Sequence, residues 1–588
     1  SPADLWNELY FGIATCNLLL QKAPLIASEQ DRNSALGEAY FLRGYNYYRL
    51  FCQYERCPLQ LEPIDVSAGV PRNFKLSSGE DVLNQVIDDL QKAYDLLRTD
   101  DWRGAGTWTK YTAAHFLAKA LLYRQSERCT WKSNYPAKTD LDRAIRLCDE
   151  VIDARGLEKD YNNLYSNWTG VDCNIEKSKE ILMSALHNDA STTVGRYGNR
   201  TYNYFSSQYN TYSGGYVPRG QYIGDMEFQR CRPTEYTYAV FDNVNDSRMW
   251  KTFKTVYGIC NNVATPDYVK AENAPTFGDQ GVLFLLNKKD DTRFRKDEFG
   301  RAAIKHTFVN PETGKWVPNV APVYAEGQYV MNTYGTSAAN RSNMFCGINK
   351  TADGSRTGEK GDAHRDVTMA RVGETYLVKA ECQVRNGDDA GALATINLLR
   401  KRAEWKAGED REYYVDGTIA FKSNSTASGN CAKGNKDANG AKLTNQQAFE
   451  YSFIQKNSYV LSTGVERPVE SESWNASSLQ ISSWNNLPAE DQAVLNGMGL
   501  SVNTLEGKVN FILNERTREL LGEWNRWDEL SRTKTLYKRA KLFNPETLYI
   551  QEHHNLRPIP QSFLDGLTND NGEPLTDQEK KDMQNPGY

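Results

Sequence analysis

Apolar residues recur at intervals of three and four along the first part of the chain, and this spacing is what most limits its fold. This spacing is seen at Leu5, Leu9, Ile13, Cys16 and Leu20, and again at Ala39, Leu42, Tyr45 and Leu50. Such spacing gathers apolar side chains on one face of a helix. Turn signals such as ERCPL, RGAGT and NYPAKTD interrupt it. We therefore predict helices at 3–22, 31–54, 78–98, 110–127 and 140–155.

The helical pattern contains an internal repeat. GEAYFLRG at 37–44 and GETYLVKA at 373–380 share the order Gly, Glu, small residue, Tyr, apolar pair and basic residue. NGDDAGALATINLLRKRA then begins with a Gly-Asp turn and continues with small residues at helical spacing. Repeats of this kind are typical of tetratricopeptide-like hairpins, which bury their apolar faces by stacking. The sequence predicts a mostly α fold with an array of helix hairpins as its scaffold.

Two segments depart from the helical pattern. From about residue 195 to 361 the sequence is rich in Tyr, Asn, Gly and Ser, and 408–505 includes the very polar SNSTASGNCAKGNKDANGAK. We predict a helical scaffold at 1–190, 362–407 and 506–588, with irregular, loop-rich insertions at 191–361 and 408–505 that form the ligand face. Together these parts make one integrated domain. The longest amphipathic helix is predicted at 507–532.

Charge and motif searches exclude several functional classes. Lys plus Arg number 70 and Asp plus Glu 75, a formal charge of −5, so the chain has no general attraction for nucleic acid. No stretch of consecutive apolar residues approaches the length of about 18 residues that a membrane-spanning helix needs. The sequence also lacks the G-x-x-x-x-G-K-[ST], G-x-S-x-G and helix-opening G-x-G-x-x-G motifs. We expect no cofactor.

Metal-binding patterns are also missing from the sequence. The eleven cysteines are scattered without a C-x-x-C pair, and the six histidines form no H-E-x-x-H. Only Cys52 and Cys57 are close enough in sequence to suggest a disulfide. The string at 435–446 resembles a calcium loop, but position twelve is Gln446, and a single formal charge favours an ordinary polar loop. We expect no metal site.

Several strings match a known family in the order in which they occur. They are LWNELYFGIATCNLLL at 5–20, EAYFLRGYNYYRLF at 38–51, YTAAHFLAKALLYRQ at 111–125, RPTEY at 232–236, DSRMWKTFKTVY at 246–257, RDVTMARVGETYLVKAE at 365–381, INLLRKRA at 396–403, ILNERTRELLGEWNRWDELSR at 512–532, LRPIPQSFL at 556–564 and the terminal QNPGY. In this order they resemble the SusD/RagB family of Bacteroidetes outer-membrane nutrient-binding lipoproteins. The resemblance implies a scaffold of four tetratricopeptide-like helix pairs, an α-α superhelix.

The same resemblance implies a function. A SusD-like protein is a non-enzymatic, cell-surface glycan-binding protein that delivers oligosaccharide or polysaccharide to a SusC-like TonB-dependent transporter. Family members usually begin with a signal peptide and a lipidated cysteine ahead of a W-x-x-L-Y helix. Here that helix starts at Trp6, and the first cysteine, Cys16, lies inside it. We expect an N-terminal lipid anchor to the outer membrane in the full-length precursor, absent from this chain.

Other functions stay open on the sequence alone. The RagB branch is associated with peptide capture, so an oligopeptide ligand is one alternative. Another is a helical glycoside hydrolase, because Glu519 and Glu523 stand four residues apart on one helix face. Arginines occur in the same stretch, and Asp528 and Arg532 are spaced for an i,i+4 ion pair, which favours a packed structural helix and no catalytic residue. A helical-repeat adaptor that binds a protein through a concave helix face is the last alternative.

Glycan binding requires aromatic rings on loops. A sugar places its apolar face on such a ring while its hydroxyls exchange hydrogen bonds with polar side chains. Suitable rings occur at 196–224, from Trp316 to Tyr334 including Tyr324, and in DDWRGAGTW at 100–108. In each case the alternative is that the ring packs inside the protein. The predicted ligand contacts are Trp102, Trp108, Tyr209, Tyr212, Trp316, Tyr329 and Tyr334.

Overall fold

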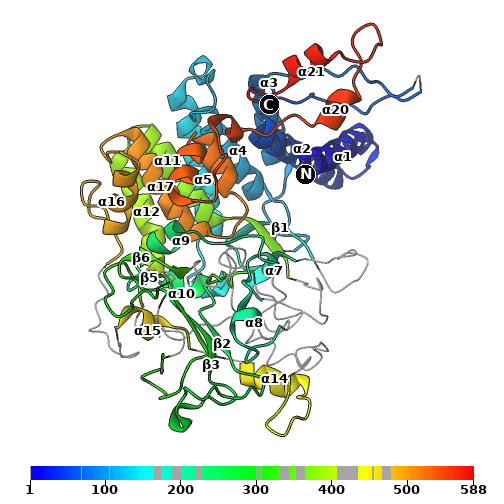
Figure 1. Cartoon of the computed structure of the whole chain (residues 1–588). Helices are drawn as coiled ribbons and strands as arrows, with labels where there is room; N and C mark the ends of the chain where they lie inside the picture. The colour runs from blue at the N-terminus through cyan, green and yellow to red at the C-terminus, as the bar shows by residue number, and fades with distance from the viewer. Residues whose placement is uncertain are drawn as a thin grey trace.

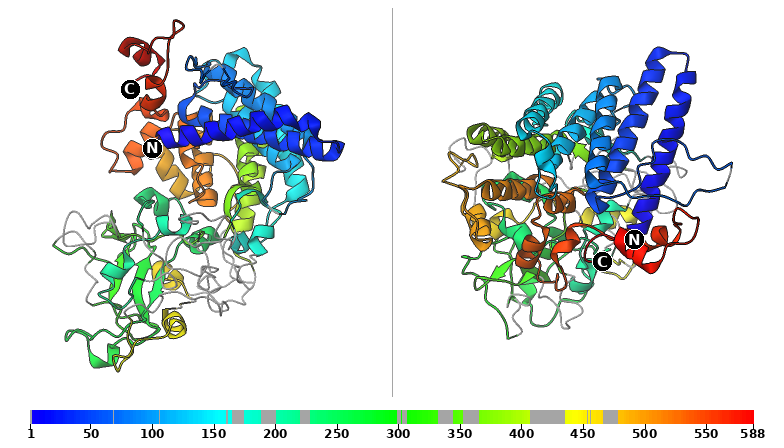
Figure 2. Two further views of the ribbon diagram at one scale, coloured as in Figure 1. Left: turned by 90° about the vertical axis from the view of Figure 1, so that its right-hand side faces the viewer. Right: turned by 90° about the horizontal axis from the view of Figure 1, so that it is seen from above.

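The computed structural model is predominantly helical. It describes residues 2–588 except 68, 105, 160, 165–173, 188–199, 220–227, 299–301, 303–306, 332–343, 352–364, 407–434, 453, 455 and 466–477. The long helices occupy one half of the molecule, and the strands β2 (Val256–Gly258) and β3 (Gln280–Leu285) lie in the other half together with short helices (Figures 1 and 2). None of the helices described is both long and apolar enough to cross a membrane.

The first half of the helical array consists of five helices that pack in chain order. They are α1 (Pro2–Lys22), α2 (Glu29–Tyr54), α3 (Gly79–Leu96), α4 (Lys110–Arg124) and α5 (Ala137–Arg155). Ser28 and Ser78 begin α2 and α3, because each hydroxyl accepts the N–H of the third residue after it. The predicted helices are confirmed, with each end within three residues of its expected position.

The remaining helices of the array come from distant parts of the chain. They are α11 (Val372–Arg385), α12 (Asp389–Ala403), α17 (Leu505–Leu520), α18 (Arg526–Arg532) and α19 (Leu536–Phe543). Helix α11 packs against α4, α5, α12 and α17, so residues 372–385 join the early helices to the late ones. Near the C-terminus, α20 (Gln561–Asp565) and α21 (Asp577–Met583) pack together, and Phe563 lies 5.0 Å from Trp6 of α1, centroid to centroid. The mostly α fold with helix hairpins is confirmed.

The single long helix predicted at 507–532 is wrong, because the chain breaks it into α17 and α18. Gly522 has φ = +83°, a conformation that residues with a side chain rarely adopt. A Cβ there would also lie 2.2 Å from Cδ1 of Ile348. The break turns Trp524 outward, and this side chain is 46% exposed.

The inserted segments form short strands and short helices. The strands are β1 (Ile181–Ala185), β2 (Val256–Gly258), β3 (Gln280–Leu285), β4 (Asn319–Pro322), β5 (Tyr324–Ala325), β6 (Gln328–Tyr329) and β7 (Val367–Arg371). Strand β3 pairs antiparallel with β2 and parallel with β4, while β1–β7 and β5–β6 are antiparallel pairs. The short helices are α7 (Thr201–Tyr204), α8 (Tyr209–Tyr212), α9 (Glu235–Ala239), α10 (Ser247–Thr252), α14 (Asn445–Ser452), α15 (Tyr459–Thr463) and α16 (Ala489–Gly497).

The insertion has an apolar core of its own, separate from that of the helices. Its members include Trp250, Phe253, Tyr257 and Phe284, all buried. The core of the helical array is built from α1–α5, α11, α12 and α17 instead. The insertion and the helical array therefore meet at a junction, and a large cleft lies at this junction.

A buried ionic cluster fastens the insertion to the helices. Arg248 of α10 is fully buried, and its Nη1 lies 2.8 Å from Oε1 of Glu515 and 3.1 Å from Oε2 of Glu519, both on α17. Arg371, at the end of β7, donates from Nη1 to Oε1 of Glu519 at 2.7 Å, and Arg402 of α12 also contacts this carboxylate. Burial alone would raise the pKa of Glu519, but these guanidinium groups outweigh it and hold the pKa far below its usual value.

Two local sequence predictions need correction. Asp528 and Arg532 do not pair with each other: Asp528 binds Arg49 of α2, and Arg532 binds Glu381 of α11 with an Nη2–Oε2 distance of 2.6 Å. Both charged groups therefore connect helices instead of stabilising α18 alone. Cys52 and Cys57 are both buried and free, so the suggested disulfide is absent from the structure.

Candidate functional site

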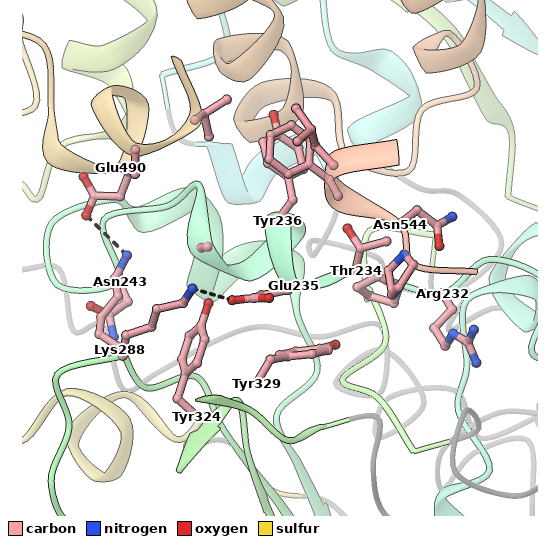
Figure 3. A pocket seen from close by; sticks show the side chains of 18 of the residues that line it. Arg232, Thr234, Glu235, Tyr236, Asn243, Lys288, Tyr324, Tyr329, Glu490 and Asn544 are labelled. Carbon is pink, nitrogen blue, oxygen red and sulfur yellow. Dashed lines mark hydrogen bonds and ion pairs between the residues drawn. The ribbon is translucent and has the colours of Figure 1, made fainter. Parts of the chain in front are cut away.

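The cleft at the junction has a volume of about 1350 Å³ (Figure 3). One side is formed by the insertion, through α9, residues 288–290 and the β5–β6 hairpin. The other side comes from α16 and from residues 542–546, at the C-terminal end of α19 and just after it. A volume of this size accommodates a ligand of several linked rings or residues. We call it the junction cleft.

Two tyrosine rings of the junction cleft stand on the β5–β6 hairpin. Tyr324 and Tyr329 are cross-strand partners, and the turn between them uses Glu326 at φ = +50° and Gly327 at φ = +71°. The two rings meet edge to face with centroids 6.3 Å apart. Asn287 fixes the strand by accepting the N–H of Tyr324 and donating to its carbonyl oxygen. The hairpin thus presents both rings at a defined angle.

Charged groups of both signs line the same cleft. Nζ of Lys289 lies 2.7 Å from Oε1 of Glu235, and Nζ of Lys288 lies 3.2 Å from Oε1 of Glu490 (Figure 3). The second pair joins the insertion to α16 across the cleft. Burial, together with the neighbouring Glu235 carboxylate, raises the pKa of Tyr324. The Tyr324 phenol therefore keeps its proton at neutral pH, and its hydroxyl oxygen is buried behind the cleft surface.

This arrangement is suited to binding. Aromatic rings, paired charges and the amide of Asn243 offer apolar contact together with donors and acceptors. Among the described residues, no three His, Cys, Asp or Glu side chains converge as a metal site would require. Asp437, in the segment that resembles a calcium loop, instead accepts the backbone N–H groups of Asn439 and Ala441, each at 2.8 Å.

The structure places one predicted ligand contact, Tyr329, in the junction cleft together with its neighbour Tyr324. Trp316 does not line this cleft. It is 4% exposed and packs edge-on against Tyr216 and Tyr268, with centroids 6.0 and 5.9 Å away. Its position is that of a core residue under the more exposed Tyr268.

Three other predicted contacts, all among the described residues, lie outside the junction cleft. Tyr209 is fully buried and stacks on Tyr257 at 4.7 Å, and Trp108 is half-buried against Phe41. Trp102 is 43% exposed, and the guanidinium carbons of Arg103 and Arg98 lie 4.4 and 5.4 Å from its ring centroid. The side chain of Tyr212 and all of Tyr334 lie outside the described residues. A role in ligand contact stays a prediction for these residues.

Several residues of the cleft were not predicted as ligand contacts. Tyr236, Lys288, Glu490 and Phe543 come from four separate parts of the chain. The ring of Tyr236 stacks on that of Phe543 with centroids 4.8 Å apart. RPTEY, which ends at Tyr236, was noted only as a family string. No local pattern indicates that residue 236 meets residue 543.

The acids of the alternative hydrolase do not lie in the junction cleft. Glu519 is fully buried within the ionic cluster. Glu523 is held by Arg371, with an Nε–Oε2 distance of 2.9 Å, and by Lys350, with an Nζ–Oε1 distance of 3.2 Å. A carboxylate whose pKa is held as low as that of Glu519 carries no proton to give to a leaving group near neutral pH.

Two protein-family models and one curated protein match this chain in sequence. Residues 150–437 match the model described as the SusD family, and residues 1–122 match the one described as starch-binding associating with outer membrane. SusD-like protein P2 of Formosa agariphila is 25% identical over 171 residues, which are 27% of this chain and 30% of that protein. The matched region thus spans less than a third of this curated relative.

Solved structures share the fold at low sequence identity. A SusD superfamily protein of Bacteroides fragilis is 16% identical with a TM-score of 0.50, and the alignment covers 100% of this chain and 86% of the other. A SusD homolog of Bacteroides thetaiotaomicron is 18% identical with a TM-score of 0.51, covering 99% and 85%. These structures show the shared fold, and the two family models, which together match most of the chain in sequence, show that the protein belongs to the SusD-like family.

Proposed function

We propose that the protein is a non-catalytic glycan-binding protein and that the junction cleft holds the saccharide. The observation that carries this proposal is the Tyr324–Tyr329 hairpin at the wall of a cleft of about 1350 Å³, in a chain whose family model is described as starch-binding. The description of that model, associating with outer membrane, also supports a location at the outer membrane.

The chemistry of the cleft suits a sugar. The half-buried ring of Tyr329 offers a face for the C–H groups of a pyranose, and the buried Tyr324 supports that ring from its edge. The Lys289–Glu235 and Lys288–Glu490 pairs supply donors and acceptors in fixed positions. Because each charge already has a counter-charge, these groups can bond to neutral hydroxyls without requiring a charged ligand.

Further parts of the proposal extend beyond the cleft. Trp102, whose side chain is 43% exposed, is a second candidate for sugar stacking. We infer delivery to a SusC-like TonB-dependent transporter and attachment through a lipid anchor from family membership. The division into a scaffold at 1–190, 362–407 and 506–588 and insertions at 191–361 and 408–505 follows the same proposal, although α16, within the second insertion, packs on α17.

Isothermal titration against a panel of oligosaccharides, beginning with malto-oligosaccharides, tests the proposal. Replacing Tyr329→Ala should weaken binding of the preferred saccharide at least about tenfold, or about 1.4 kcal/mol. Tyr588→Ala is the matched control, because Tyr588 is exposed at the opposite end of the chain and outside the cleft. The Tyr588→Ala variant should bind the saccharide with the same affinity as the unmodified protein.

Two results would contradict the proposal. If no saccharide bound while a panel of oligopeptides did, the ligand class would be wrong and the peptide alternative would stand. If saccharide chains were shortened on incubation, and a Glu519→Gln or Glu523→Gln variant that remained folded lost this activity, the protein would be a hydrolase.

A further inference from the structure

A second cleft lies next to the junction cleft and has a different character. Its volume is about 870 Å³, and it shares the Tyr236–Phe543 wall with the first cleft. The rest of its lining is mainly apolar and includes Leu521, Trp524, Leu530 and Ile550. Trp524 is 46% exposed and rests on Phe205, with centroids 5.7 Å apart, so part of its surface stays open to the cleft. We call it the apolar cleft.

Two guanidinium groups lie at the wall that the clefts share. Arg526 and Arg539 each place an Nη nitrogen 3.4 Å from the hydroxyl oxygen of Tyr236. Arg526 also donates to the carbonyl oxygen of Leu513 at 2.6 Å, and Arg539 bonds to Asn510 through Nε at 3.1 Å. Among the residues that the structure describes, neither guanidinium forms an ion pair with a carboxylate.

The carboxylates that line the apolar cleft are already engaged by other cations. Glu523 is bound by Arg371 and Lys350, Glu529 by Arg532, and Glu546 by Arg232. A third arginine of the lining, Arg516, pairs with Glu374 at 3.1 Å and lies 3.5 Å from Glu529. The charge left without a counter-charge at this wall is therefore positive.

The pKa values of Arg526 and Tyr236 agree with an excess of positive charge at this wall. Burial and the nearby Arg539 lower the pKa of Arg526 to about 10. Burial raises the pKa of Tyr236, but Arg526 and Arg539 outweigh it and bring the pKa below its usual value. Removing two cations from bulk water without a counter-ion costs desolvation free energy. An anion bound between the two guanidinium groups would recover part of this free energy.

We propose that the apolar cleft binds an amphipathic organic anion, with its acid group at Arg526 and Arg539 and its apolar body against Trp524, Leu530 and Ile550. A planar carboxylate matches the fork of a guanidinium group and forms charge-assisted hydrogen bonds with it. The apolar walls exclude a fully hydrated ion and favour a ligand with a hydrocarbon or aromatic body. This ligand is distinct from the glycan of the junction cleft, and its binding does not depend on the proposed glycan function.

Octanoate is the probe ligand. The uncharged control ligand is 1-octanol, which has a carbon chain of the same length but no charge. We expect isothermal titration to show octanoate binding at least about tenfold more tightly than octanol, because only the carboxylate forms charge-assisted hydrogen bonds with the two guanidinium groups. Arg526→Gln should remove this difference by weakening octanoate alone. Trp524→Ala should weaken both compounds. Arg72→Gln, at an exposed arginine far along the chain and outside both clefts, should change neither affinity.

The comparison of octanoate with octanol on the unmodified protein decides the question even if Arg526→Gln does not fold. Equal affinities for the two compounds, or no binding of octanoate, would overturn the proposal. So would a folded Arg526→Gln variant that binds octanoate as tightly as the unmodified protein. Octanoate binding abolished by Tyr329→Ala but not by Trp524→Ala would place the anion in the junction cleft and would also contradict it.

Discussion

Replacing Glu519→Gln removes one negative charge from the centre of the buried ionic cluster and keeps the shape of the side chain. In the unmodified protein the carboxylate contacts Arg371 at 2.7 Å, Arg248 at 3.1 Å and Arg402. In the variant, an amide N–H₂ takes the place of one oxygen and meets guanidinium donors. At least one former hydrogen bond then becomes a contact between two donors.

The size of the effect follows from burial. The side chain of Glu519 is fully buried, and so are its partners apart from a few per cent of Arg371 and Arg402. Removing one member of a buried ion pair costs about 3–5 kcal/mol, because the remaining charge is left without compensation. The three contacts do not add, since Glu180, Glu515 and Glu523 still neutralise part of the cluster. We expect the free energy of unfolding to fall by about 3–5 kcal/mol in total.

Urea denaturation at pH 7, followed by tryptophan fluorescence, measures this loss. Glu506→Gln is the matched control, because Glu506 lies exposed in the first turn of the same helix, α17. Its free energy of unfolding should stay within about 0.5 kcal/mol of the unmodified protein. A loss below about 1 kcal/mol for Glu519→Gln would refute the conclusion that this cluster holds the insertion on the helices.

Two further predictions concern stability. The pKa values of Glu374 and Glu515 lie below the usual 4.5, because neighbouring cations outweigh the opposing effect of burial. Both carboxylates therefore stabilise the fold above about pH 4.5 and lose this effect as the pH falls through the lowered values; calorimetry from pH 7 to 3 should show a falling Tm, and an unchanged Tm would contradict the assignment. Gly522→Ala should cost about 1–3 kcal/mol in thermal unfolding, whereas Gly497→Ala, where a Cβ meets no atom within 4 Å, should not destabilise the protein.

The helical array could be predicted from the sequence because each helix buries one face along its whole length. That burial imposes spacings of three and four, which can be read without knowing the partner helix. The end of α17 could not be predicted in this way. Residues 507–532 keep helical spacing throughout, and the break at Gly522 is fixed by the tertiary approach of Ile348. The local sequence around a glycine in a helical pattern does not show whether the helix continues through the glycine or ends near it.

The candidate site could be predicted only in part. Alternating aromatic and polar residues indicated Tyr329, but the same pattern included Tyr209 and Trp316, which the structure buries. Since the insertion has an aromatic core of its own, composition does not separate core rings from surface rings. Trp524 shows the opposite case: it lies within the helix predicted at 507–532, which was expected to be packed, yet the turn at Gly522 exposes it.

The way the insertion is attached explains how a cleft made from loops can keep a fixed shape. Arg518 of α17 donates to the carbonyl oxygen of Val240 at 2.7 Å, and Tyr236 donates to Oδ1 of Asn514 at 2.9 Å. Together with Arg248, these contacts hold α9 and α10 on α17 through directed polar bonds, which fix orientation more strictly than apolar contact does. Because α9 is part of the wall between the junction cleft and the apolar cleft, both clefts are preformed. Ligands then bind without first ordering the loops that receive them, and the entropic cost of binding is correspondingly small.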